Sequence, residues 1–162
     1  MCAFPHTRER LRHLRLWSLS LVDPDTPRAI GGLVGLKTLN LIGCCRLPHS
    51  GIVDMLRVGA TDEGDAPRQQ LEELWLGGVH FITDSAIATL AQEHGGSLHT
   101  LDVSGCRLLT DDALMSLAAD DGDGAIAPCL TKVFANSCSR LRDNGMSPSP
   151  RRGCYVHTVC WY

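Results

Sequence analysis

Residues 98–106 read LHTLDVSGC, and residues 36–44 read LKTLNLIGC. Both follow the pattern L-x-x-L-x-[LV]-x-G-C, in which apolar residues alternate toward the end of the stretch. Two further copies, LEELWLGGV at 71–79 and LTKVFANSC at 130–138, keep the apolar positions, and a weaker copy begins at Leu11. Alternation with a period of two predicts a short strand with one buried face. The starts at 11, 36, 71, 98 and 130 therefore predict a series of similar strands.

The second half of each unit predicts a helix. Counted from the Cys position, apolar residues recur at +3, +8 and +11 in the units that begin at 36, 71 and 98, and at +3 and +8 in the unit that begins at 130. A spacing of three suits a helix with one buried stripe. Asp84 and Asp111 lie where the N-cap or first turn of such a helix is expected. Pro48 and His49 stand at that place in the unit that begins at 36, so its helix start is less clearly marked.

A single strand–turn–helix unit cannot bury its apolar faces alone, so the units are expected to stack against one another. Such stacking predicts an α/β solenoid of four to five repeats. The Cys position, occupied by Cys44, Cys106 and Cys138, should face the interior of the turn. There a small thiol fills space and forms weak hydrogen bonds with the turn backbone.

The pattern resembles the leucine-rich repeat, and specifically its cysteine-containing subtype. The subtype reads L-x-x-L-x-L-x-x-C followed by x-x-[IL]-T-D-x-x-[IL]-x-x-[IL]-A. The copies at 71–91 and 98–118 match it nearly throughout, apart from Val79 in the Cys place, and those at 36–56 and 130–146 match in part. The resemblance implies a curved solenoid with parallel strands on the concave side and helices outside. Spacings of 35 and 32 residues exceed a usual unit of about 26, which predicts solvated insertions at 59–67 and 120–125.

The 162 residues suffice for one domain with a substantial core. We predict an N-terminal flank at 1–10, a repeat domain at 11–146 and an irregular C-terminal tail at 147–162, in which apolar residues 153–162 could alternatively form a small edge strand. A net charge of −3 argues against nucleic-acid binding. No apolar run approaches a membrane span. Eight cysteines without a secretory signal indicate a reducing compartment, which predicts a cytoplasmic or nuclear protein.

The variable residues of the strands are the candidate binding surface. The residue between the last two apolar positions of each strand should point to the concave face. Large aromatic side chains flanked by charges are typical of protein-binding hot spots, although large apolar residues are also common on surfaces without a partner. We predict that a protein partner binds the concave face through Arg15, Asn40, Glu73, Trp75, Asp102, Lys132 and Phe134.

Motifs for catalysis or cofactor binding are weak. Cys154, His157 and Cys160 form C-x-x-H-x-x-C, but zinc prefers four N or S ligands and no C-x-x-C accompanies them, so a packed or unstructured tail is the simpler interpretation. Residues 120–124 lack the later ligands of an EF-hand, and residues 32–38 lack the Gly-Lys of a P-loop. We therefore predict a protein without catalytic activity, metal or cofactor.

Proteins that this subtype resembles are chiefly the substrate-recognition parts of F-box ubiquitin ligases and related mitotic-exit antagonists. The resemblance implies that the concave face holds a target protein for an SCF-type ligase. An F-box would be a helical segment ahead of Leu11, and only ten residues stand there, so this role requires a truncated chain or another subunit that supplies the link. The alternatives are a stand-alone binding module, a fragment of a longer repeat protein, and a metal-dependent module built on the tail.

Overall fold

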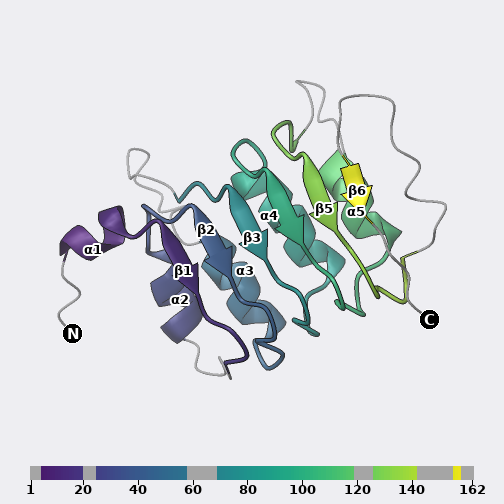
Figure 1. Cartoon of the computed structure of the whole chain (residues 1–162), viewed down its shortest axis with the longest axis horizontal. Coiled ribbons are helices and arrows are strands. Elements are labelled where there is room, and N and C mark those ends of the chain that lie inside the picture. Colours follow the sequence, from purple (N-terminus) through teal and green to yellow (C-terminus); the bar gives the residue numbers. More distant parts are fainter. Residues whose placement is uncertain (1–4, 20–24, 58–68, 119–125, 142–154, 158–162) are drawn as a thin grey trace.

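The computed structural model describes residues 5–19, 25–57, 69–118, 126–141 and 155–157, and in them short strands alternate with helices (Figure 1). The elements in chain order are α1 (Pro5–Arg10), β1 (His13–Arg15), α2 (Asp25–Gly31), β2 (Thr38–Asn40), α3 (His49–Arg57), β3 (Glu73–Trp75), α4 (Asp84–His94), β4 (Thr100–Asp102), α5 (Asp111–Ala118), β5 (Lys132–Phe134) and β6 (Tyr155–His157). The units that begin at 36, 71 and 98 each supply one strand and one helix, as the sequence pattern predicts.

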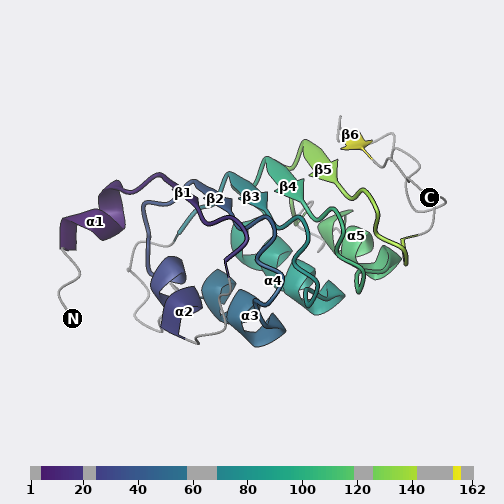
Figure 2. The same ribbon diagram turned by 60° about the horizontal axis from the view of Figure 1, so that its bottom comes forward.

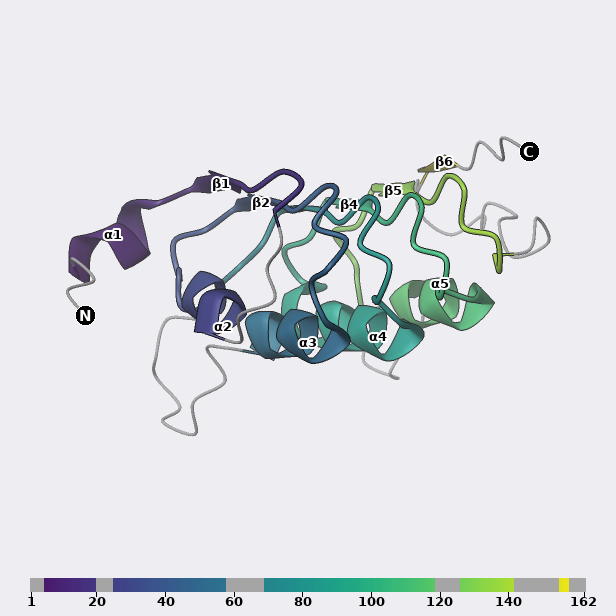
Figure 3. The same cartoon turned by 90° about the horizontal axis from the view of Figure 1, so that it is seen from below.

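The strands of the described residues join one parallel sheet in the order β1-β2-β3-β4-β5-β6. The register pairs equivalent positions of successive units, so that Leu39 lies between Leu14 and Leu74, and Leu101 lies between Leu74 and Val133. Helices α2 to α5 lie along one side of the sheet, as Figures 2 and 3 show. The predicted α/β solenoid, with parallel strands in one sheet and helices along one side, is thus confirmed. We call the opposite side of the sheet the strand face.

The core lies between the sheet and the helices, and its members are the repeated apolar positions. The strand leucines of the three central units are fully buried: Leu36, Leu39, Leu41, Leu71, Leu74, Leu76, Leu98 and Leu101. The predicted helix stripe is buried at Ile52 and Met55 in α3 and at Ile87 and Leu90 in α4. Burial of this apolar surface is the main source of stability for the stack.

The three repeat cysteines are buried and bond to the unit before their own. The thiols of Cys44, Cys106 and Cys138 donate to the carbonyl oxygens of Leu16 at 2.8 Å, Leu76 at 3.4 Å and Val103 at 3.2 Å, respectively. Burial raises the pKa of the Cys106 thiol to about 12, and the pKa of Cys44 is also raised, first by burial. The thiols of Cys44 and Cys106 are therefore protonated at neutral pH. All three repeat cysteines link neighbouring units through their hydrogen bonds.

The turns that follow the strands stack in register as well. The backbone N–H of Gly43 donates to Gly77 O at 2.8 Å, and that of Gly78 donates to Ser104 O at 2.7 Å. Gly43, Gly78 and Gly105 have φ values of +75°, +75° and +73° at equivalent positions. Glycine is the residue that adopts this region without strain, which explains its recurrence before the Cys position.

The starts of α3 and α4 both form hydrogen bonds to the next unit. The helix start that the sequence marks less clearly, near Pro48 and His49, lies at His49. The Nδ1 atom of His49 lies 3.2 Å from Thr83 Oγ1 in the next unit. Asp84 likewise bonds to the unit after its own. Its carboxylate accepts hydrogen bonds from Thr110 N at 2.8 Å and from Thr110 Oγ1 at 2.7 Å. Asp84 is the first residue of α4, and its side chain bonds to Thr110 of the following unit.

The flanking segments contribute elements of their own. Helix α1 occupies part of the 1–10 flank, and Gly35 N donates to Arg8 O at 2.9 Å. A Cβ atom at Gly35 would collide with the backbone of Glu9, so this close approach requires glycine. Strand β6 pairs in parallel with β5, as the edge-strand alternative for residues 153–162 expected. The predicted insertions at 59–67 and 120–125 lie outside the described residues, and the domain boundaries stay a prediction.

Candidate protein-binding surface

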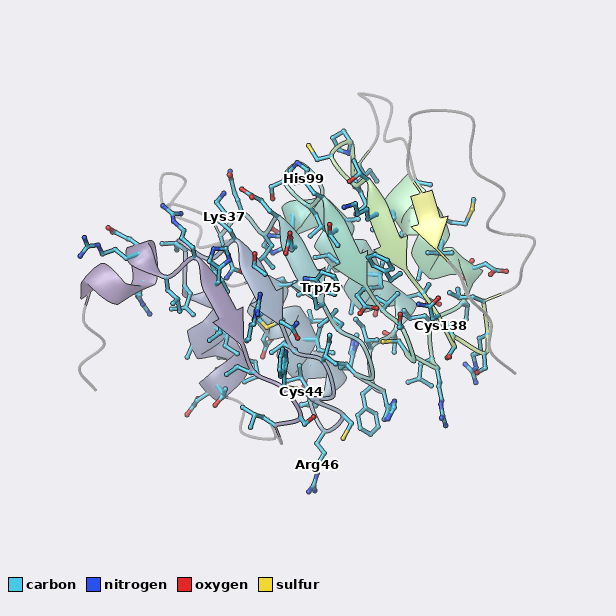
Figure 4. The ribbon with its side chains drawn as sticks, viewed as in Figure 1. Lys37, Cys44, Arg46, Trp75, His99 and Cys138 are labelled. Atoms are coloured by element: carbon cyan, nitrogen blue, oxygen red, sulfur yellow. The ribbon has the colours of Figure 1, made fainter. Side chains whose placement is uncertain are left out.

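The register places the predicted binding residues in two rows across the strand face. One row joins Arg15, Asn40, Trp75, Asp102 and Phe134, and the other joins His13, Thr38, Glu73, Thr100 and Lys132. Trp75 lies near the middle of this face (Figure 4). Residues that are far apart in the sequence are therefore neighbours on one surface.

Trp75 on β3 and Phe134 on β5 form a stacked aromatic pair. Their ring centroids lie 5.9 Å apart with an interplanar angle of 18°. Strand β4 lies between β3 and β5, so the two backbones are about 10 Å apart. The rings must therefore lean toward each other above β4. Stacking of this kind adds to the energy of apolar burial and holds both rings in one orientation.

Asp102 occupies the β4 position beneath the aromatic pair and is only 9% exposed. Its Oδ1 accepts the backbone N–H of Ser104 at 2.9 Å. Gly77 leaves room for this carboxylate, because a Cβ atom there would lie 3.2 Å from Asp102 Oδ2. Asp102 is thus placed to support the aromatic pair and offers little surface to a partner.

Asn40 has a similar local role on β2. Its Oδ1 accepts the backbone N–H of Ile42 at 3.1 Å, which repeats the bond between Asp102 and Ser104. Asn and Asp side chains commonly bond to the backbone two residues later in turns. The sequence carried this signal, because Asn40 and Asp102 each stand three residues before a turn glycine. Sequence reasoning used only their direction and missed the bond.

Of the remaining predicted residues, Glu73 and Lys132 lie on the strands of the aromatic pair, and Arg15 lies farther away on β1. Glu73 is half-buried, and its Oε2 accepts Trp75 Nε1–H at a long 3.5 Å. Lys132 and Arg15 are exposed, on β5 and β1 respectively. Trp17, which follows β1, is 60% exposed and was not among the predicted contact residues. The strand face therefore presents an ordered aromatic centre with charges on its flanks.

Metal binding has no candidate site among the described residues. They contain no group of three or more His, Cys, Asp or Glu side chains that could hold a metal ion. Cys154 and Cys160 lie outside the described residues, as does the side chain of His157, so the weak zinc motif stays untested. No described helix has the length and apolar character needed to cross a membrane.

Comparisons with known proteins show a distant likeness to solved structures. No family model and no curated protein matches the chain. Among solved structures, it is similar to a chain in the crystal structure of a Rad7 and Elc1 complex in yeast, at 18% sequence identity and a TM-score of 0.41. The match covers 80% of this chain and 43% of that chain, so this chain spans less than half the length of its structural neighbour.

Proposed function

We propose that this protein is a non-catalytic scaffold that binds a protein partner through its strand face. The observation that carries the proposal is the aromatic pair of Trp75 and Phe134. Each ring stands next to a core residue of its strand, Leu74 or Val133, so it points to the side of the sheet opposite the core. Aromatic residues held in one orientation lose little conformational freedom when a partner covers them. Repeat solenoids use extended surfaces of this type for binding.

The residues around the aromatic pair favour a protein partner of mixed charge. Glu73 and Lys132 flank the pair with opposite signs, and Arg15 lies farther along the face on β1. Charges at the edge of an apolar centre direct orientation and association rate, whereas the apolar centre supplies most of the affinity.

The repeat pattern further suggests substrate recognition within an SCF-type ubiquitin ligase. This part of the proposal rests on the resemblance of the units at 71–91 and 98–118 to the cysteine-containing leucine-rich repeat. In that role the strand face holds the target, and another segment or subunit supplies the connection to the ligase. Free cysteines within the core fit a cytoplasmic or nuclear location, which we include in the proposal.

Affinity purification of the intact chain from its own cells, followed by mass spectrometry, tests both levels of the proposal. Recovery of a cullin-ligase adaptor together with enriched target proteins supports the ligase role. Recovery of partners without the adaptor supports a separate binding module. If only chaperones are recovered, the scaffold proposal loses its basis.

Variants of the aromatic pair then test the surface itself. We expect Trp75→Ala to weaken binding of the recovered partner by about 1–3 kcal/mol, which is a loss of affinity of about 5- to 150-fold. Met115→Ala is the matched control, because Met115 is 65% exposed on α5, away from the strand face. Unchanged affinity for Trp75→Ala, with the fold intact by circular dichroism, would remove the aromatic pair from the binding site.

A further inference from the structure

A second surface runs along the edge of the solenoid where the strands end and the turns begin. It consists of the two residues after the Cys position in three successive units. We call it the turn rim: Cys45, Arg46, His80, Phe81, Arg107 and Leu108, all of which are exposed. Figure 4 shows Arg46 projecting away from the body of the solenoid at this edge.

The stacked turns align these residues. Hydrogen bonds from Gly43 N to Gly77 O and from Gly78 N to Ser104 O join the three turns in register. Equivalent residues of bonded neighbours are about 5 Å apart at the ladder. Arg46, Phe81 and Leu108 are equivalent, because each stands two residues after the Cys position. The turn rim is therefore an ordered row of side chains on a hydrogen-bonded base.

The turn rim combines positive charge with exposed apolar area. Phe81 is 52% exposed and Leu108 is 37% exposed. Neither Arg46 nor Arg107 forms an ion pair with another described residue. No rim residue is acidic, although the whole chain has a net charge of −3, so the positive charge here is a local feature.

The carboxylates that follow the rim in sequence are placed at the helix starts. Both oxygens of Asp84 are occupied by Thr110. Asp111 and Asp112, at the start of α5, line a hollow of about 540 Å³ together with Arg140 of the following unit. The stretch from Arg46 to Leu108 thus keeps guanidinium groups available to carboxylates from outside.

We propose that the turn rim binds a segment of a partner protein that combines Asp or Glu with large apolar side chains. Guanidinium groups form paired hydrogen bonds with carboxylates, and Phe81 and Leu108 gain from being covered by apolar groups. Two arginines interleaved with apolar residues fit such a segment better than a nucleic acid, whose affinity comes from many phosphate contacts. The row is also narrower than the apolar face with which helices lie on membranes.

Selection from a displayed library of random 12-residue peptides tests this proposal with the full chain. We expect the enriched peptides to be acidic and to contain Leu, Phe or Trp. Fluorescence anisotropy with labelled copies of these peptides measures their affinity. We expect at least about tenfold weaker binding to the double variant Arg46→Glu/Arg107→Glu, and likewise to the single variant Phe81→Ser. Arg57→Glu is the matched charge control, because Arg57 is exposed at the end of α3, nine residues long, whereas the rim lies near its start.

Each outcome separates this surface from the strand face. Trp75→Ala should leave peptide binding unchanged, since the turn rim does not depend on the aromatic pair. The proposal is wrong if the enriched peptides are neutral or basic, if Trp75→Ala abolishes their binding, or if peptides with every apolar residue replaced by Ser bind equally well. It is also wrong if no acidic peptide is enriched and the unmodified chain instead binds phosphatidylserine vesicles, or a 20-nucleotide single strand of DNA, in a way that the double arginine variant does not.

Discussion

Leu101 on the central strand β4 provides the most direct test of how the stack is stabilised. Its side chain is fully buried, and its register partners Leu74 and Val133 are buried on the two adjacent strands. Leu101→Ala removes three carbon groups, worth about 2.4 kcal/mol at about 0.8 kcal/mol each. The cavity adds to this cost, because strands bonded on both sides have little freedom to close it. We expect a loss of about 3–4 kcal/mol in the free energy of unfolding.

Urea unfolding followed by circular dichroism measures this loss, and Leu108→Ala is the matched control. The same atoms are removed from Leu108, but 37% of that residue is exposed, so the expected cost is below about 1 kcal/mol. If Leu101→Ala is too unstable to purify, Leu101→Val should cost about 1 kcal/mol. Equal losses for Leu101→Ala and Leu108→Ala would refute the inference that the repeated strand leucines hold the units together.

Further predictions concern a backbone position, a histidine and the thiols. Gly78→Ala should lower the free energy of unfolding by about 1–2 kcal/mol in thermal unfolding, because φ at this position is +75°. The nearest atom to the new Cβ is 3.8 Å away, so the cost comes from the backbone conformation and not from a clash. A stabilised variant would contradict this prediction. Burial lowers the pKa of His94 below 6.5. As pH falls below about 6.5, the unfolded chain therefore binds the proton before the folded chain does, so the free energy of unfolding should decrease from pH 7 to 5. The decrease should be smaller in His94→Gln, and an equal decrease in both proteins would contradict this prediction. Iodoacetamide at pH 8 should modify exposed Cys45 before Cys106, whose pKa is about 12, as peptide mass spectrometry can verify.

The repeat positions made the architecture predictable from the sequence. In the three central units, the strand begins two residues after the first Leu of L-x-x-L. The register joins Thr38 with Glu73 and Glu73 with Thr100, as the alignment of the copies implies. The Cys position is buried as predicted, at Cys44, Cys106 and Cys138, and Val79 is buried at the same place. Periodicity is informative here because every unit solves the same packing problem.

The geometry of the candidate surface could not be derived in the same way. Column positions indicate which face a residue occupies, but they do not show that Trp75 and Phe134 lean together across a strand. The burial of Asp102 follows from that contact and from the absence of a side chain at Gly77. Such features depend on pairs of units, whereas the repeat pattern describes one unit at a time.

The aromatic pair also affects how cooperatively the stack holds together. Helix contacts run between successive units, from α2 to α3, α3 to α4 and α4 to α5. Trp75 and Phe134 instead connect β3 with β5 and pass over β4, which makes them a second-neighbour coupling in an array dominated by first-neighbour contacts. Fraying of β5 therefore separates the rings while the units around Trp75 stay folded. A partner that contacts both rings opposes this fraying. Partner binding to the strand face should therefore slow hydrogen exchange in β5.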